Sequence, residues 1–361
     1  MKQRKLELAS WQRPLRSPVS IHGVTRSVRE GLWLRAEDST GKLYRAECAP
    51  LWGWHQESVS EAKAALKAVA HEFCHVQVKP ERVSLDSRYF GLWPEAPELP
   101  VSVQTALELL LFQEAQIQGH PDFQRETRAV KAPAECAALL SLPPSSAPEL
   151  WREQVDSLVR RGYTTFKIKV GRQDWALEEP YLRELKERVG PRLRLRCDLN
   201  QIDLLQTVNF ARLQEELSID YWEEPPESWQ KALQSNGLSW AIDEGLRGLD
   251  PRKDTPDASV WILKPNALGL QRSLHWMRKA QILKRRVILS NCYESEWTLA
   301  TYAWFYHQLL AQPEALGFGT LEQFSEPWRD KLLTIWEPGV PWPSQGFAPI
   351  DPPFGDCWEP L

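Results

Sequence analysis

Five short apolar segments between residues 165 and 266 each end in charged side chains, and this pattern restricts the possible folds more than any other feature. Successive charged ends are 20 to 29 residues apart, with amphipathic helical patterns between them. This spacing is typical of successive βα units, which take roughly 30 residues each in an eight-fold barrel. Because the carboxyl ends of parallel strands meet at one face, the charges are expected to converge on one mouth. They are Lys169, Asp198, Glu223, Asp243 and Lys264.

Alternating apolar and helical patterns extend this prediction to the chain after residue 135. Strands are expected at 136–142, 164–171, 192–199, 220–224, 239–244, 259–264 and 286–291, with a weak last strand near 316–318. Helices are expected at 148–161, 175–188, 204–217, 228–235, 270–284 and 295–311. Strands that alternate with helices in this way indicate an α/β protein with a parallel sheet.

The first part of the chain has a different pattern, which predicts a small α+β domain. Residues 5–48 have the alternation of antiparallel strands, and residues 18–26 are expected to form a loop that lies over a pocket. Ser58 and Glu61 match a capping box that opens a helix at residue 59. The two helices expected here cover 59–75 and 102–118.

The composition is that of a soluble globular protein with a sizeable core. Of 361 residues, 42% are hydrophobic and 25% are charged, and a net charge of −4 leaves no basic patch for nucleic acid. No apolar run approaches the roughly 18 residues of a membrane helix, and no apolar stretch of a secretory signal follows the basic start of the chain. The six scattered cysteines lack Cys-x-x-Cys pairs, which is typical of reduced thiols. We therefore expect a cytoplasmic protein with no membrane or nucleic-acid partner.

Lys167 and Lys169 are two residues apart, so both side chains point to one face of a strand. If that face is the barrel interior, like charge and desolvation lower a lysine pKa, as a base that removes a proton from carbon requires. The alternative is an outward, solvated face. The intervening residues Phe166, Ile168 and Val170 are apolar and suit a barrel wall packed against helices, which favours the inward orientation.

The carboxylates Asp198, Glu223 and Asp243 follow three successive apolar strands, and oxygen ligands suit Mg²⁺ or Mn²⁺. A single Asp after a strand is usually a helix N-cap, but three at successive strand ends are less easily explained in that way. The neighbouring Glu224 and Glu244 are expected to point away and are not predicted as ligands. The three carboxylates thus predict a divalent cation, with a lysine on either side.

A competing motif lies in the first domain, where His71-Glu72-Phe-Cys-His75 matches the His-Glu-x-x-His pattern of zinc peptidases. The motif ends a predicted helix, and no good third ligand follows nearby. A chance match on an exposed helix end is the simpler interpretation, and zinc found at these residues would reverse it.

The order of the barrel motifs resembles the enolase superfamily, in its muconate-lactonizing-enzyme-like subgroup. The matching motifs are Lys-x-Lys, Asp-x-Asn, Glu-Glu-Pro, Asp-Glu and Leu-Lys-Pro. Within the superfamily the chain is most similar to the o-succinylbenzoate synthase family, through residues 46–58 and 289–295. The resemblance implies an α+β capping domain in residues 1–125 and a modified TIM barrel, (β/α)₇β, in residues 126–335. The Pro-rich tail, 336–361, would add to the cap without regular structure.

The resemblance also implies the site and the reaction. Mg²⁺ would lie on the three carboxylates, with Lys169 as the base, Lys167 beside it and Lys264 on the opposite face. Substrate contacts are expected from Asn200, Ser290, Asn291, Glu294 and Trp54. The implied reaction is the Mg²⁺-dependent dehydration of 2-succinyl-6-hydroxy-2,4-cyclohexadiene-1-carboxylate to 2-succinylbenzoate, a step toward menaquinone. The alternatives are N-acylamino-acid or dipeptide racemisation and muconate cycloisomerisation. The expected partner is a small carboxylate substrate, and the chain is expected to be a monomer or a weak homo-oligomer.

Overall fold

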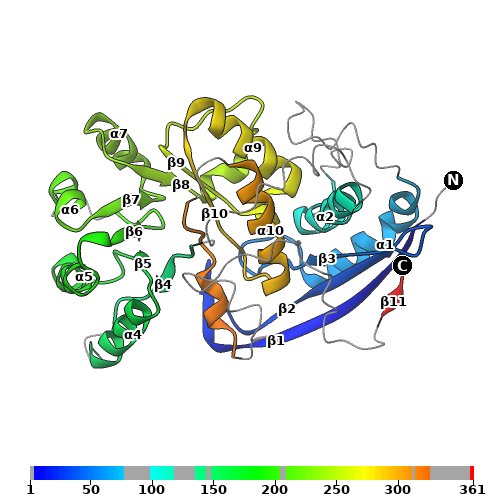
Figure 1. Cartoon of the computed structure of the whole chain (residues 1–361), viewed down its shortest axis with the longest axis horizontal. Coiled ribbons are helices and arrows are strands. Elements are labelled where there is room, and N and C mark those ends of the chain that lie inside the picture. Colours follow the sequence, from blue (N-terminus) through cyan, green and yellow to red (C-terminus); the bar gives the residue numbers. More distant parts are fainter. Residues whose placement is uncertain are drawn as a thin grey trace.

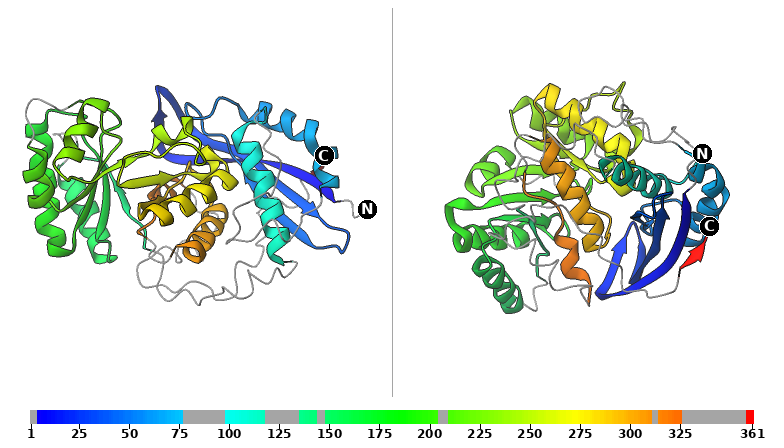
Figure 2. Two further views of the ribbon diagram at one scale, coloured as in Figure 1. Left: turned by 90° about the horizontal axis from the view of Figure 1, so that it is seen from above. Right: turned by 45° about the vertical axis from the view of Figure 1, so that its right-hand side comes forward.

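The computed structural model describes residues 4–76, 98–117, 135–143, 148–203, 209–310, 314–325 and 358–361. These residues form two sheets, an antiparallel one near the chain termini and a curled parallel one at the other end of the molecule (Figures 1 and 2). The predicted combination of an α+β cap and a modified barrel is confirmed. None of the described helices is both long and apolar enough to cross a membrane.

The cap sheet has the strand order β11-β1-β2-β3. Its strands are β1 (Lys5–Ile21), β2 (Val24–Glu37), β3 (Leu43–Cys48) and β11 (Glu359–Pro360). The cap helices are α1 (Val59–His75) and α2 (Val101–Ile117). The predicted capping box is present, since Ser58 accepts the Glu61 N–H and the Glu61 carboxylate accepts the Ser58 N–H. Buried side chains of both helices join those of β2 and β3 in one core.

The parallel sheet has seven strands in the order β10-β9-β8-β7-β6-β5-β4. They are β4 (Ala138–Leu140), β5 (Thr165–Lys169), β6 (Arg194–Asp198), β7 (Ile219–Glu223), β8 (Trp240–Ile242), β9 (Val260–Leu263) and β10 (Arg286–Leu289). Single bridges from Cys136 to Leu316 and from Ser290 to Gly317 join the two edges. The weak strand predicted near 316–318 therefore closes the barrel.

Helices follow the strands and cover the outside of the curled sheet (Figure 1). They are α4 (Pro148–Arg160), α5 (Trp175–Val189), α6 (Phe210–Glu216), α7 (Glu227–Ser235), α9 (Leu270–Leu283) and α10 (Glu296–Leu309). The short helix α8 (Pro265–Leu268) packs against α2 of the cap, where Thr105 donates to the Pro265 carbonyl oxygen. Short 3₁₀ turns are η2 (Gly190–Arg192), η3 (Glu244–Gly248) and η4 (Gly319–Gln323). Phe166 and Ile168 of β5 are fully buried in the main core, as a barrel wall requires.

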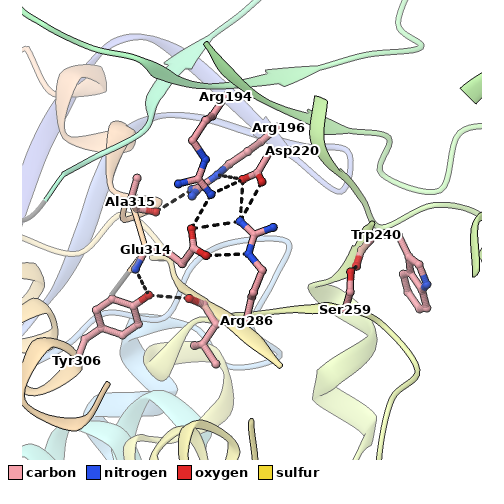
Figure 3. Close-up of polar contacts among 10 residues, drawn as sticks. Arg194, Arg196, Asp220, Trp240, Ser259, Arg286, Tyr306, Glu314 and Ala315 are labelled. Carbon is pink, nitrogen blue, oxygen red and sulfur yellow. Dashed lines mark hydrogen bonds and ion pairs between the residues drawn. The ribbon is translucent and has the colours of Figure 1, made fainter. Parts of the chain in front are cut away.

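The residues around Leu316 and Gly317, which join the two edges of the sheet, are preceded by Glu314. An ion-pair network holds Glu314 at the amino-terminal end of the strands (Figure 3). Arg286 of β10 and Arg194 of β6 both bond the carboxylate of Glu314, at 2.7 Å each, and both also bond Asp220 of β7. The Glu314 backbone N–H donates to the Tyr306 hydroxyl of α10 at 3.1 Å. The network fixes Glu314 two residues before Leu316, which explains how so weak a strand keeps its place.

Two expectations about the cap are wrong. Residues 18–26 are not a loop, because they form the ends of β1 and β2 and the tight turn at His22-Gly23. The cause is cross-strand pairing, which continues to Ile21 and Val24. The tail is not wholly irregular, because Glu359 pairs with Leu8 of β1. The rest of the predicted tail before Trp358, and the predicted domain boundaries near 125 and 335, lie outside the described residues.

The cap is fastened to the barrel by buried charge. Arg13 of β1 donates two hydrogen bonds to the Glu296 carboxylate at the start of α10, both 2.9 Å long, and both side chains are almost fully buried. Glu47 of β3 accepts hydrogen bonds from the Ser295 N–H and hydroxyl and from the Thr298 hydroxyl. These contacts connect two strands of the cap to the amino-terminal turn of one barrel helix.

We predict that Arg13→Met lowers the free energy of unfolding by roughly 3–5 kcal/mol, because it removes two charge-assisted hydrogen bonds from the buried Glu296 carboxylate. The double variant Arg13→Met/Glu296→Leu should recover most of this loss, because it removes both charges. The matched control is Arg212→Met, which breaks an exposed pair with Glu216 and should change stability by less than about 1 kcal/mol. Urea unfolding of the four proteins measures the effect, and equal stability of wild type and Arg13→Met would contradict it.

Candidate active site

The charged residues predicted for the mouth do lie together at the carboxyl ends of neighbouring strands. Lys169 ends β5 and is in register with Asp198 at the end of β6, which is in register with Glu223 at the end of β7. Asp243 follows β8 directly, and Lys264 follows β9. The sheet thus brings residues nearly 100 positions apart in the sequence to one edge.

Lys167 points into the barrel, as predicted, and pairs with two of the carboxylates. Its Nζ donates a hydrogen bond to Glu223 Oε1 and lies 3.1 Å from Asp198 Oδ2. Burial alone lowers the pKa of Lys167, but the charges of Asp198, Glu223 and Asp243 raise it, and the net pKa lies well above the ordinary value. Lys167 therefore keeps its proton and remains an ammonium ion. The expectation that both lysines of β5 have a lowered pKa is wrong for Lys167.

Lys169 differs from Lys167 although they share a strand and a face. Its side chain reaches the mouth and keeps part of its surface exposed. Desolvation by the surrounding protein is the largest cause that lowers its pKa, and the charges of Lys167, Arg172 and Lys264 lower it further, whereas Asp198 opposes them. Of the three mouth lysines, only Lys169 has a lowered pKa, so it releases its proton most easily.

Lys264 lies on the other side of the carboxylates. Its Nζ donates to Asp243 Oδ2, and the Trp54 ring of the cap covers the ammonium with its centroid 4.2 Å away. Burial lowers the pKa of Lys264, but Asp243 and Glu244 raise it, and the net pKa lies above the ordinary value. Lys264 therefore holds its proton firmly.

The three carboxylates have the chemistry of a cation site. Their side chains are almost completely buried, and burial is the main cause that raises the pKa of Glu223, with the charges of Asp198 and Asp243 adding to it. Glu223 Oε2 is buried and has no hydrogen-bond partner among the described residues. An orphaned, buried carboxylate oxygen beside two further carboxylates fits a hard divalent cation.

As the side chains stand, no three acidic, imidazole or thiol groups of the described residues are close enough together to form a metal site. Instead, Lys167 contacts Asp198 and Glu223, and Lys264 contacts Asp243. A cation at these carboxylates would replace part of that ammonium contact.

Two further glutamates, which were not predicted as functional, shape the mouth. Glu224 accepts the backbone N–H groups of Asp243 and Gly245, so it holds the turn that carries Asp243. Glu178 in the first turn of α5 accepts the N–H groups of residues 171–173 and so orders the loop after Lys169. An acidic residue in the first turn of the helix after a functional strand was the available signal for Glu178.

The predicted substrate-contact residues have mixed positions. Glu294 is buried, and its Oε2 accepts the Cys292 N–H, so it supports the loop after β10; burial raises its pKa to about 7. Asn291 and Ser290 both donate to the Gly317 carbonyl oxygen, which secures the barrel closure. Asn200 accepts from Arg172 at 2.9 Å beside the mouth. Trp54 is the one of the five that directly faces a predicted catalytic side chain.

The segment of residues 49–56 leaves β3 and covers Lys264; it is called the lid segment below. Its Trp54 and Leu51 pack with Ala267 and Cys292 of the barrel. Gly53 has a positive φ of 68°, and a Cβ there would lie 2.2 Å from the Ile21 carbonyl oxygen. The lid segment is therefore pressed against the end of β1, and both cap elements meet over the mouth.

Arg29 of β2 joins the lid segment to the loop after β10. All its hydrogen bonds go to backbone carbonyl oxygens, including Ala49 and Pro50 of the cap and Cys292 and Tyr293 of the barrel. Burial lowers its pKa, against the charges of Glu47 and Glu294. A fully buried guanidinium thus fixes the distance between cap and barrel beside the site.

The competing motif stays apart from this mouth. His71, Glu72 and His75 are exposed on α1, a helix of the cap that lies away from the barrel strands β4 to β7 (Figure 1). The two imidazole rings lie 4.7 Å apart, and His75 Nδ1 contacts the His71 carbonyl oxygen at 2.7 Å. With no third ligand among the described residues, the peptidase interpretation gains no support.

A capped barrel with acidic and basic groups gathered at its carboxyl-end mouth has the architecture of a TIM-barrel enzyme. Residues 150–254 match the family model described as "Enolase C-terminal domain-like". The chain is 27% identical to the o-succinylbenzoate synthase of Thermosynechococcus vestitus over 347 residues, which cover 91% of this chain and 97% of that protein. Part of the barrel therefore matches the enolase C-terminal family, and the whole sequence is similar to curated o-succinylbenzoate synthases.

Two solved structures illustrate the shared fold. A substrate-liganded L-Ala-D/L-Glu epimerase from Bacillus subtilis has a TM-score of 0.73 at 17% identity, with 91% of this chain and 92% of that one covered. A dipeptide epimerase from Methylococcus capsulatus, complexed with Mg and the dipeptide L-Arg-D-Lys, has a TM-score of 0.72 at 18% identity, with 91% and 93% covered. At these identities the similarity establishes the fold alone.

Proposed function

We propose that the protein is a cytoplasmic o-succinylbenzoate synthase that dehydrates 2-succinyl-6-hydroxy-2,4-cyclohexadiene-1-carboxylate to 2-succinylbenzoate in menaquinone biosynthesis. The observation that carries the proposal is the division of the mouth lysines. Lys169 has a lowered pKa, whereas Lys264, across the carboxylates, has a raised one. A syn-elimination needs one base and one fixed positive charge, and the mouth offers both.

In the proposed reaction Lys169 does the proton chemistry. Its neutral amine removes the proton next to the substrate carboxylate, and the C–H electron pair enters an enediolate. The resulting ammonium then protonates the hydroxyl that departs from the same face, so that the C–O bond breaks and water leaves. The ring becomes aromatic, and Lys169 returns to its neutral form. A lysine with a lowered pKa is suited to the first step because more of it is unprotonated near neutral pH.

The remaining charges would stabilise the anion. When bound, Mg²⁺ (or Mn²⁺) would be held by Asp198, Glu223 and Asp243 and would supply positive charge to the substrate carboxylate. Lys264 keeps its proton and contributes a fixed charge across the ring, as electrostatic stabilisation requires. Lys167 balances the buried charge of Asp198 and Glu223. The lid segment would exclude water from the intermediate.

The similarity to synthases over nearly the whole length supports this reaction over the alternatives. The epimerase folds make racemisation of a dipeptide or N-acylamino acid the second candidate. A racemase would need Lys169 and Lys264 to exchange protons in turn, so it would exchange deuterium into both enantiomers of its substrate. The ion pair of Lys264 with Asp243 and its raised pKa favour the role of a fixed charge.

We predict that Lys169→Arg abolishes turnover, because a guanidinium stays protonated and cannot act as the base. Lys264→Arg keeps the charge and should retain measurable activity. The assay is ultraviolet detection of succinylbenzoate with Mg²⁺ present, and thermal unfolding controls for folding. Wild-type turnover by Lys169→Arg would refute the mechanism.

We predict that Mg²⁺ raises the melting temperature of the chelator-treated protein, because a ligand that binds only the folded state stabilises it. Glu223→Gln should remove this response, since it takes away one carboxylate of the set, and turnover should fall with it. The control is Glu215→Gln, at an exposed acidic position, which should respond like wild type. Full activity after exhaustive chelation would contradict a metal-dependent reaction.

A further inference from the structure

His55 is a buried imidazole at the junction of the lid segment and the barrel, and none of the steps proposed above uses it. Its exposed fraction is 8%. Both ring nitrogens have hydrogen-bond partners, one within the lid segment and one in the barrel. The contacts that such a ring can make depend on which of its nitrogens carry a proton.

The first contact shapes the lid segment itself. Nδ1 of His55 accepts the backbone N–H of Leu51 at 2.8 Å. The Leu51 carbonyl oxygen in turn accepts the backbone N–H groups of His55 at 2.8 Å and Trp54 at 3.1 Å. The ring therefore closes the turn that presents Trp54, from the opposite side to the backbone bonds.

The second contact reaches the barrel. Nε2 of His55 lies 2.9 Å from the carbonyl oxygen of Asn266, two residues after Lys264. A second hydrogen bond joins Asn266 to the lid segment, because its Nδ2 donates to the Ala49 carbonyl oxygen at 2.7 Å. Since a backbone N–H can only donate, Nδ1 carries no proton, and the proton of the neutral ring is on Nε2.

Both contacts act on the position of Trp54, whose indole ring also contacts His22 and Arg247. The turn from Leu51 to His55 carries the indole ring, and the Asn266 contact holds that turn beside the end of β9. The result is the indole centroid 4.2 Å from the Lys264 ammonium. Such a cation–π contact, in a desolvated position, stabilises the ammonium in place.

We infer that His55 is a positioning residue: as the neutral Nε2–H imidazole it holds the lid segment, and with it Trp54, over Lys264, and it opens the Leu51–His55 turn that presents Trp54 when the ring gains a second proton. A proton on Nδ1 would turn this nitrogen into a donor that faces the Leu51 N–H, which is also a donor. The hydrogen bond between them would be lost, and the turn would open. The Asn266 contact would remain possible, so the lid segment would loosen at its tip first. The inference holds for any reaction at this mouth and does not rest on the proposed dehydration.

The charges around the ring agree with a neutral closed state. Burial is the main cause that lowers the pKa of His55, and Arg29 of β2 and Arg247 of η3 lower it further. The hydrogen bond to Asn266 and the charge of Glu57 oppose them, and the net pKa lies below the ordinary value. The open ring, in water, has an ordinary pKa of about 6.5. The pKa of His55 is thus lower in the closed form than in the open form. As the pH falls below about 6.5, the open form binds a proton and the closed form does not, so the closed form loses stability. At about one pH unit below that value, the opening equilibrium should rise roughly tenfold.

Amide hydrogen exchange of the lid segment tests the inference without any substrate. We expect the protection of residues 49–56, corrected for the intrinsic effect of pH, to fall roughly tenfold between about pH 7.5 and about pH 5.5. Residues 270–283 of α9 serve as the internal reference and should keep their protection. Constant protection of the wild-type lid segment over this range would overturn the inference, whatever the variants do.

Two substitutions separate the contacts. His55→Asn places an acceptor near the Nδ1 position and does not titrate, so it should keep the protection of Leu51 at both pH values. His55→Gln reaches toward Asn266 but leaves Leu51 without its acceptor, so protection should be low at both. His71→Asn, at an exposed ring on α1, should behave like wild type. An acid-induced loss that persists in His55→Asn would show that another group is responsible and would refute the assignment.

A kinetic readout distinguishes this role from failure of the proposed reaction. If the protein is active on the cyclohexadiene substrate, the wild-type KM should rise below about pH 6.5 while that of His55→Asn stays level. If no substrate is turned over, the exchange measurement still decides the inference. Loss of exchange protection together with a constant wild-type KM would limit His55 to fold support and would contradict its role in positioning Trp54.

Discussion

The charge balance at the barrel mouth is the constraint on which the rest of the structure depends. Three buried carboxylates stand at the ends of adjacent strands, and their mutual repulsion would be costly without Lys167 and Lys264 between them. The same ion pairs give the mouth lysines different pKa values, because Lys167 and Lys264, which contact carboxylates, have raised pKa values. Lys169, which projects past these pairs, is left with a lowered pKa. A single arrangement thus supports the fold and supplies the lysine that we propose as the base.

The cap is positioned by buried polar contacts that converge on two places beside this mouth. At the end of β10, Arg13, Arg29 and Glu47 bond to the loop and to the first turn of α10. At the end of β9, Thr105 donates to the Pro265 carbonyl oxygen, and His55 donates to that of Asn266. These bonds are directional, so they fix the lid segment more narrowly than apolar packing alone would.

The barrel and its mouth could be predicted from the sequence because both follow from periodicity. Strand ends recur at regular spacing, so Asp198, Glu223 and Asp243 had to meet once the sheet was parallel. The different pKa values of Lys167 and Lys169 could not be predicted, since they depend on which carboxylates each ammonium reaches. The extent of the β1–β2 hairpin was also missed, because Pro18 and Gly23 suggested a loop where cross-strand pairing continues. The hydrogen bond from the Cys292 N–H to Glu294 could not be predicted either, since the place of Glu294 after β10 does not show which way its side chain points.

The titration of the individual mouth lysines tests the central claim most directly. Trace acetylation of the chelator-treated protein over a pH series, with each lysine quantified by mass spectrometry, gives the three pKa values separately. Lys169 should react as an amine with a pKa below the ordinary lysine value of about 10.4, and Lys167 and Lys264 should not. In Lys167→Met the pKa of Lys169 should rise, because a neighbouring like charge is gone. A common, ordinary pKa for all three lysines, or a lower value for Lys264 than for Lys169, would contradict the division of roles at the mouth.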